Sequence, residues 1–193
     1  MAETSLTLLE RLRQRPDTEA WRRLMDLYAP LIGRWLARWS LQPADHDDLM
    51  QEVSSVIVRK LADFQRQREG SFRAWLRLIT ANCLREHWRR SQRQPLGTGD
   101  SNFLQKLQEL EDPQSPLAQL WNDEHDRHVA HRLLATVEQQ FEPTTREAFR
   151  RVVMLGEKPE AVAAELGITV NAVFLAKSRI LRRLRCESDG LLS

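Results

Sequence analysis

The chain has 193 residues, 41% of them hydrophobic and 29% charged, and a formal net charge of only +2. This composition indicates a soluble globular protein that can bury a core, in one domain or two small ones. Its two cysteines, Cys83 and Cys186, lie far apart and fit neither a disulfide framework nor a zinc site, which suits a reducing cytoplasm. The N-terminus lacks the apolar run of a signal peptide, and nothing approaches the ~18 apolar residues of a membrane span, so we expect no membrane insertion.

Helical periodicity dominates the sequence, and no stretch alternates in polarity as a β-strand does. Residues 5–14 predict a short amphipathic helix that Pro16 ends. We expect a second helix to begin at a cap, Asp17 or Thr18, and to be kinked or broken at Pro30, where a helical hydrogen bond is lost. The chain is therefore predicted to be all-α.

A third helix is predicted to begin at Asp45 as its cap and to end near Leu61. Its apolar face carries Leu49, Val53, Val56 and Ile57, and its polar face carries Asp48, Gln51, Glu52, Ser55 and Arg59. The acidic residues could suggest a carboxylate metal site, but no histidine or second acidic helix accompanies them. A docking face for another protein is the expectation.

The stretch from Ser71 to Arg93 carries the most informative pattern. One helical stripe is an apolar core face, made of Phe72, Trp75, Leu76, Ile79 and Cys83. The opposite side and the basic end carry Arg77, Ala81, Leu84, Arg85, Trp88, Arg89, Arg90 and Arg93, and the preceding loop, Phe64 to Ser71, adds Arg66 and Arg68. Arginine neutralises phosphate and an exposed indole stacks on an unpaired base, which favours a nucleic-acid surface. The alternative is that Trp88 packs on a neighbouring helix and the arginines are solvated.

Residues 94–114 are predicted to form an acidic, flexible linker, although a short helix over 102–111 is compatible with the sequence. From Gln94 to Asp126 there are seven acidic residues and one lysine. From Ile168 to Arg185, in contrast, there are five basic residues and no acidic one. This asymmetry is expected of a protein with nucleic-acid surfaces at separate places.

The linker would separate two small helical domains, residues 1–93 and residues 115–193. In the second domain, Ser115 can cap a helix whose first turn holds Pro116. Pro143 begins another helix, which Gly156 would end.

Residues 159–185 predict a helix-turn-helix, in which Gly167 is placed for a left-handed C-cap and Thr169 can cap the second helix. The contact positions are apolar or small, namely Val162, Ala163, Leu166, Ile168, Val173 and Ala176. In a major groove, such a helix contacts base edges and phosphates with its remaining side chains, here Thr169, Asn171, Phe174, Leu175, Lys177, Ser178 and Arg179. The alternative is a helical hairpin with a basic exposed face.

Taken in order, these motifs resemble those of the bacterial RNA polymerase sigma factors, most closely the short, two-domain extracytoplasmic-function (ECF) group. DDLMQEV, residues 47–53, is similar to the family's core-polymerase-binding helix. The segment over residues 70–90 is similar to the family's next segment, with matching positions at Phe72, Trp75, Leu76, Ile79, Asn82, Glu86 and Arg89. REAFRRVVMLGEKPEAVAAELGITVNAVFLAKSR resembles the C-terminal domain, so the resemblance covers nearly all of residues 20–185.

The resemblance implies a function in transcription initiation. The third helix would bind the clamp coiled coil of core RNA polymerase through Asp48, Gln51, Glu52 and Arg59. The loop and the basic aromatic helix would recognise and melt the minus-ten promoter element through Arg66, Arg68, Arg77, Asn82, Arg85, Trp88, Arg89 and Arg90. The linker would thread the polymerase channel. The helix-turn-helix would contact the polymerase flap and read the minus-thirty-five element through Thr169, Asn171, Phe174, Lys177, Ser178 and Arg179. An anti-sigma factor is a further candidate partner, and the site of action would be the cytoplasm.

The sequence departs from the family pattern at three places. Ser54 stands where many relatives have an aromatic residue, and Ala161 replaces a frequent glutamate. Phe174-Leu175-Ala176 occupies the place of a common Lys-Ser-Arg run. Base contacts in that helix are therefore not transferred from the family.

Other features point to other functions. His125, His128 and His131 recur every third residue beside acidic residues, which leaves a helical metalloprotein or hydrolase as one alternative, but a helix cannot turn all three toward one ion. The sequence has no phosphate-binding glycine loop and no nucleophile motif, so we predict no catalytic residue, no metal, no cofactor and no enzyme activity. A further alternative is a helix-turn-helix regulator that binds an operator. A sigma factor should bind core polymerase tightly and free promoter DNA poorly, and a repressor the reverse.

Overall fold

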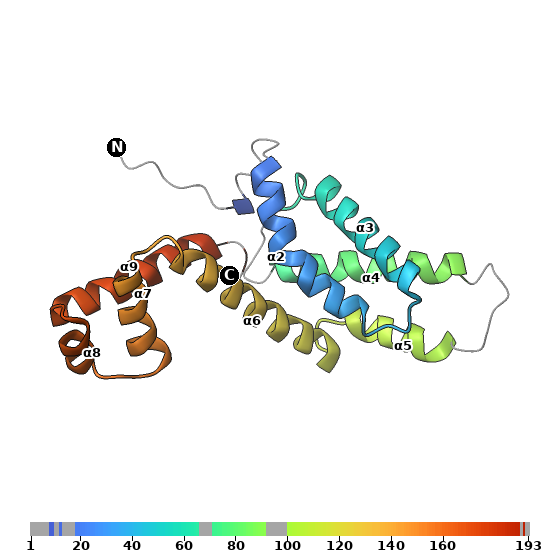
Figure 1. Cartoon of the computed structure of the whole chain (residues 1–193). Coiled ribbons are helices and arrows are strands. Elements are labelled where there is room, and N and C mark those ends of the chain that lie inside the picture. The colour runs from blue at the N-terminus through green and yellow to red at the C-terminus, as the bar shows by residue number, and fades with distance from the viewer. Residues whose placement is uncertain are drawn as a thin grey trace. The chain divides into compact units, whose positions relative to one another are not determined.

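The computed structural model describes residues 8, 9, 12, 18–65, 71–91, 100–189 and 191. These residues form helices and turns and include no strand, which confirms the predicted all-α class (Figure 1). In chain order the helices are α2 (Thr18–Leu36), α3 (Pro43–Lys60), α4 (Ser71–Ser91), α5 (Asp100–Glu111), α6 (Pro116–Glu138), α7 (Pro143–Phe149), the π-helical η1 (Arg150–Met154), α8 (Pro159–Leu166) and α9 (Val170–Ser188). The helix expected over residues 5–14 lies almost wholly outside the described residues.

The described residues divide into two compact units, and the division falls inside α6, between Val129 and Ala130. The sequence placed the second domain's start at residue 115. The structure moves this boundary because the first half of α6 belongs to the N-terminal core, where Trp121 is fully buried with its ring centroid 4.7 Å from that of Trp35. The N-terminal unit therefore holds α2 to α5 and the start of α6, and the C-terminal unit holds the end of α6 through α9.

The N-terminal core is built on α2, which packs against α3, as α3 does against α4. Tyr28 of α2 is completely buried and meets the edge of the Phe72 ring at 5.5 Å. The predicted break at Pro30 does not occur, since α2 runs unbroken through it. Pro30 lies on the exposed side of α2, while Tyr28 and Leu31 on either side of it are held in the core.

Helix α3 begins three residues earlier than predicted, because its N-cap is Gln42 and not Asp45. Gln42 is its N-cap without a side-chain hydrogen bond, Pro43 opens the first turn, and Asp45 lies inside that turn. Proline is preorganised for this position, and a carboxylate in the first turn interacts favourably with the helix dipole, so both residues stabilise the start without a capping side chain. The predicted apolar face is correct in substance, because Leu49, Val53 and Ile57 are fully buried and Val56 is half-buried.

The expected flexible linker is wrong for residues 100–111, which form helix α5 packed on α4. Leu107 and Leu110 are each only 1% exposed, and the Phe103 ring lies 4.8 Å from that of Trp39. Phe103, Leu107 and Leu110 follow the i, i+4, i+7 spacing of an amphipathic helix. The composition of this segment, rich in acidic residues and glutamine, predicted a linker, and the short apolar stripe was overlooked.

In the C-terminal unit, helices α8 and α9 flank the short turn for which the sequence predicts a helix-turn-helix. Helices α8 and α9 meet at a bend of 106°. Gly167 ends α8 with φ +65°, and the Thr169 side chain caps α9 by accepting a hydrogen bond from the Ala172 amide. The predicted contact residues form its core, with Val162, Ala163, Val173 and Ala176 buried around Ala148, and Leu166 and Ile168 packed against them.

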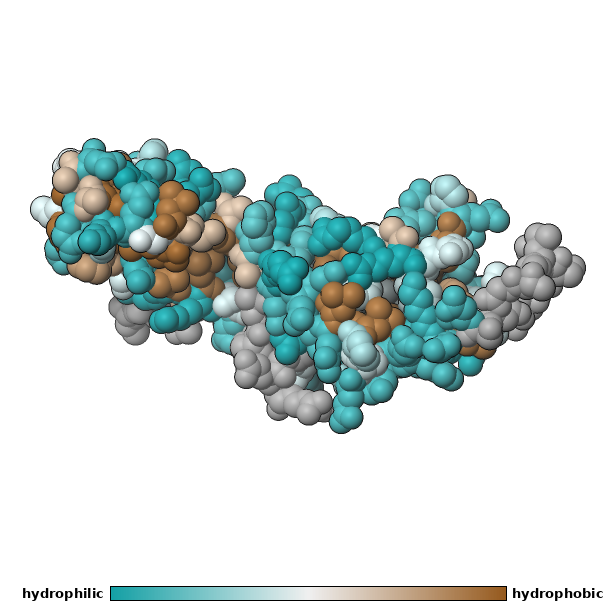
Figure 2. All heavy atoms as spheres, turned by 90° about the horizontal axis from the view of Figure 1, so that it is seen from below, coloured by the Kyte–Doolittle hydropathy of each residue, from teal (hydrophilic) through white to brown (hydrophobic). Residues whose placement is uncertain are grey.

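The surface of this unit is mixed. Several large apolar side chains are exposed, namely Val153, Met154, Leu155, Phe174 and Leu175. Figure 2 shows one face of the molecule, with hydrophobic residues lying among hydrophilic ones. In the described part of the chain no single helix is long and apolar enough to cross a membrane, and α8 with α9 meets the length and composition criteria only as a bent pair.

Candidate nucleic-acid interface

The polar face of α3 is presented to solvent as the sequence predicted. Asp48, Gln51 and Arg59 are exposed, whereas Glu52 is half-buried. The Glu52 carboxylate accepts a hydrogen bond from Arg90 of α4 at 2.6 Å. The polar face of α3 is thereby tied to the basic end of α4, and three of the four side chains predicted to bind polymerase are exposed.

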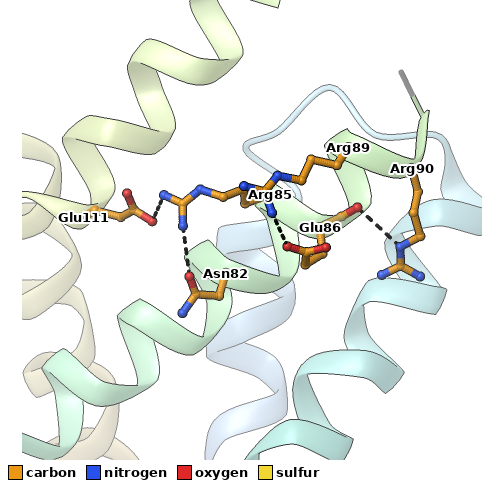
Figure 3. A network of polar contacts seen from close by, with 6 residues as sticks. All are labelled: Asn82, Arg85, Glu86, Arg89, Arg90 and Glu111. Atoms are coloured by element: carbon orange, nitrogen blue, oxygen red, sulfur yellow. Dashed lines mark hydrogen bonds and ion pairs between the residues drawn. The ribbon is translucent and has the colours of Figure 1, made fainter. Parts of the chain in front are cut away.

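The basic end of α4 carries a polar network that Figure 3 shows. Arg89 donates to Glu86 at 2.8 Å, and the Arg90 Nε donates to the backbone carbonyl of Glu86 at 3.3 Å. The Arg89 and Arg90 side chains are each 60% exposed, so both keep most of their surface in water. Pairs of this kind contribute little to stability and can exchange a carboxylate for a phosphate.

Arg85 is less exposed than Arg89 and Arg90 and contacts helix α5. It donates to Asn82 within α4 at 3.0 Å and forms an ion pair with Glu111 at the end of α5 (Figure 3). The Arg85 side chain is 29% exposed and that of Glu111 25%. Glu111 therefore neutralises the Arg85 guanidinium in this structure.

Trp88 packs on the same helix, α5. Its ring and that of Phe103 are stacked, with centroids 6.3 Å apart and planes inclined by 12°. Phe103 also contacts Trp39, and Lys106 of α5 donates to the Arg38 carbonyl at 2.7 Å and lies over the Trp39 ring. Trp88 is half-buried, so the packing alternative that the sequence left open is realised in this structure.

Arg77 does not lie on the surface where the sequence placed it. It is only 3% exposed, and its Nε and Nη1 atoms have no hydrogen-bond partner among the described residues. Burial lowers the pKa of the guanidinium, and the negative charge of Asp112 opposes that shift. A helical wheel gives the direction of a side chain but not what covers it, which is why Arg77 was misplaced.

Two contact residues were missed from the sequence, Phe103 and Glu111. Both belong to the segment expected to be a linker, and the amphipathic spacing of Phe103 with Leu107 and Leu110 was the signal that could have found them. Two predicted residues, Arg66 and Arg68, lie outside the described residues.

The α9 surface places its predicted residues together on one helix. Asn171, Phe174, Lys177, Ser178 and Arg179 are exposed, with Phe174 at 52%. Thr169 is exposed as well, but its hydroxyl is engaged as the helix cap. An exposed ring followed one turn later by basic side chains, on the second helix of a pair that meets at 106°, has the composition of a groove-binding surface.

The histidines of α6 serve packing. His125 is fully buried, stacks on Tyr28 with ring centroids 5.6 Å apart, and bonds Asp126 through Nδ1 at 2.9 Å. His128 bonds the Leu27 carbonyl at 2.7 Å, whereas His131 is exposed. No group of three acidic, histidine or cysteine side chains that could hold a metal ion occurs in the described part of the chain.

The comparisons with known proteins bear on the N-terminal unit. Residues 24–94 match the family model of Sigma-70 region 2. No curated protein matches the chain. The matched range runs from the middle of α2 through α4 and contains both the α3 docking face and the basic aromatic helix.

Proposed function

The chain belongs to the sigma-70 family of RNA polymerase sigma factors, and from this premise we propose that it is an ECF-group sigma factor that directs promoter recognition and melting in the cytoplasm. The observation that carries the proposal is the juxtaposition, within one matched domain, of an exposed polar face on α3 and an arginine and tryptophan face on α4. A protein that joins polymerase to DNA needs both surfaces. It supplies binding and no chemistry of its own.

Polymerase binding is assigned to α3. Asp48, Gln51 and Arg59 offer charges of both signs and an amide on an exposed helix face, which suits docking on a charged coiled coil. In the free protein Glu52 pairs with Arg90, and it becomes available to the polymerase when Arg90 exchanges this carboxylate for a DNA phosphate. The occupant of this face is the clamp coiled coil of core polymerase.

Minus-ten recognition and melting are assigned to α4 and the loop before it. Asn82, Arg85, Trp88, Arg89 and Arg90 lie along the last turns of α4. Trapping an unpaired base against an indole offsets part of the free energy of opening a base pair, and the arginines neutralise the adjacent phosphates. Arg66 and Arg68 of the loop would add two further cations beside the opened strand.

Minus-thirty-five recognition is assigned to α9. Asn171, Phe174, Lys177, Ser178 and Arg179 would enter the major groove, and the same unit would contact the polymerase flap. Phe174 replaces a polar residue common in the family and is suited to contact a thymine methyl group.

Run-off transcription reconstituted with core polymerase on a genomic DNA library tests the proposal. We expect initiation that depends on this protein, and no such initiation would refute it. Tight binding to free promoter DNA with no binding to core polymerase would instead support the operator-binding regulator.

Two pairs of variants separate the surfaces. Asp48→Arg should abolish core binding, while Asp123→Arg, an exposed residue of α6, makes the same charge change away from the docking face. Trp88→Ala should impair permanganate-detected opening of duplex promoters about tenfold or more while core binding is retained. Trp21→Ala removes another half-buried indole, from α2, and should leave opening intact. Equal loss of opening and core binding in Trp88→Ala would show that this face is structural.

A further inference from the structure

Helix α5 lies on the part of α4 to which melting is assigned, and it does so with the chemical groups of a nucleic acid. Glu111 presents a carboxylate to Arg85, where DNA would present a phosphate. Phe103 presents an aromatic ring to Trp88, where DNA would present an unpaired base. Helix α5 thus contacts both the Arg85 guanidinium and the Trp88 ring.

We propose that α5 is an internal competitor for unpaired DNA, and that it must leave α4 before Arg85 and Trp88 can bind the opened strand. The free protein therefore binds single-stranded DNA weakly. Displacement of α5 activates the same surface. This inference rests on the assignment of the α4 face to DNA made above.

The geometry allows α5 to move alone. Helix α6 is anchored separately, by Trp121 against Trp35 and by His125 against Tyr28. Between the two helices lies a short turn, residues 112–115. The Gln114 amide donates to Asp112, and Ser115 caps α6 by accepting from the Ala118 amide. The Ser115 hydroxyl also donates to the Glu109 carbonyl of α5, and this bond must open before the turn can act as a hinge.

Some of the contacts that hold α5 are suited to exchange with DNA, whereas the contacts of Phe103 with Trp39 and of Lys106 with Arg38 and Trp39 must also break when α5 leaves. A helix of 12 residues is marginal by itself, so α5 depends on what it packs against. Leu107 and Leu110 bury its apolar stripe, while the Arg85–Glu111 pair is partly open to solvent. Such a pair is weakened by salt and by competing phosphates.

Fluorescence anisotropy of the full-length protein with a labelled single-stranded DNA of randomised sequence, about 16 nucleotides long, tests the proposal. Glu111→Gln should raise affinity about two- to fivefold, because one contact of α5 is removed. Glu111→Gln combined with Phe103→Ala should raise it about tenfold or more. Adding Trp88→Ala to this double variant should abolish the gain.

Glu109→Gln is the matched control. It removes the same charge from the same helix, but Glu109 is exposed and bonds Gln105 of its own helix. An equal gain in DNA affinity in Glu109→Gln would show that the effect comes from the change in net charge and not from release of α5, and it would overturn the proposal. A gain that survives Trp88→Ala would overturn it as well, because the DNA would then bind elsewhere.

Hydrogen exchange of the α5 amides supplies a second readout. These amides should exchange faster in the double variant and in wild-type protein saturated with the oligonucleotide. Unchanged protection in either case would refute displacement, as would faster exchange in the double variant without tighter DNA binding.

Promoter opening by the Trp88→Ala protein distinguishes this inference from the proposed function. If that variant opens promoters normally, melting is wrongly assigned to the face, whatever α5 does. If the variant fails to open promoters but release of α5 leaves DNA affinity unchanged, the assignment survives and internal competition is refuted.

Discussion

Replacing Trp121 by alanine tests whether the start of α6 belongs to the N-terminal unit. Trp121 is completely buried, and its ring lies 4.7 Å from that of Trp35. Had residues 94–114 been a linker that ends the first domain, Trp121 would lie in the other domain and its loss would leave the N-terminal helices unchanged. The structure predicts the opposite, a large loss of stability in the N-terminal unit.

The size of that loss follows from burial. Removing a tryptophan side chain of about 200 Å² from the core, at about 25 cal/mol per Å², costs about 5 kcal/mol. The buried Nε1 of Trp121 has no hydrogen-bond partner among the described residues, and relief of this unpaired donor returns about 1–2 kcal/mol. The net loss is therefore about 3–4 kcal/mol, within the range of about 3–5 kcal/mol for large aromatic truncations in cores.

Intrinsic fluorescence can follow the N-terminal unit within the intact chain, because all six tryptophans lie in it. Guanidinium unfolding monitored in this way should show the loss in Trp121→Ala. The neighbouring Leu120→Ala is the control, since Leu120 is 43% exposed, and it should cost less than about 1 kcal/mol. A Trp121→Ala loss no larger than that of Leu120→Ala would refute the assignment of α6 to this unit.

Three further predictions concern other parts of the chain. Gly167→Ala should destabilise the C-terminal unit by about 1 kcal/mol, because φ is +65° while no atom of the described residues lies within 4 Å of the added Cβ. Hydrogen exchange of the α9 amides measures this loss, and a loss above about 3 kcal/mol would indicate a steric clash instead. Burial raises the pKa of the Cys83 thiol to about 11. A maleimide at neutral pH should therefore label exposed Cys186 rapidly and Cys83 only on unfolding. Labelling of both thiols at the same rate would contradict this prediction. Burial lowers the pKa of His125, although its hydrogen bond to Asp126 opposes the shift. As the pH falls below about 6.5, the unfolded state therefore binds a proton before the folded state does, and the N-terminal unit loses stability. His125→Phe should flatten this dependence in the fluorescence unfolding curves, whereas His131→Phe, at an exposed position, should not.

The features that depend on local pattern were predictable from the sequence. The spacing of Leu49, Val53 and Ile57 identified the buried face of α3, and Gly167 and Thr169 located the turn between α8 and α9. In these cases the periodicity of apolar residues, or the backbone requirement of one residue, determines the structure without reference to distant parts of the chain.

The features that depend on a tertiary partner were not predictable in the same way. Trp88 left two interpretations open because its neighbour, Phe103, lay in a segment judged by its acidic content. Arg77 was assigned to the surface because nothing in its own helix reveals that it is buried. Charge composition describes the outer face of α5, whereas packing is decided by the few apolar residues of its inner face.

A face suited to unpaired DNA is difficult to leave uncovered. It must carry an indole that can stack on a base and a guanidinium that can bind phosphate. Exposing the indole surface to water is unfavourable. Helix α5 satisfies both groups with Phe103 and Glu111, and by doing so it makes DNA binding competitive. Linkage makes this relation quantitative. When the state with α5 bound on α4 predominates, a tenfold increase in its equilibrium population over the released state lowers the apparent affinity of the α4 face for DNA about tenfold. Stability of α5 on α4 and affinity for the opened strand should therefore vary inversely across any series of Glu111 and Phe103 variants.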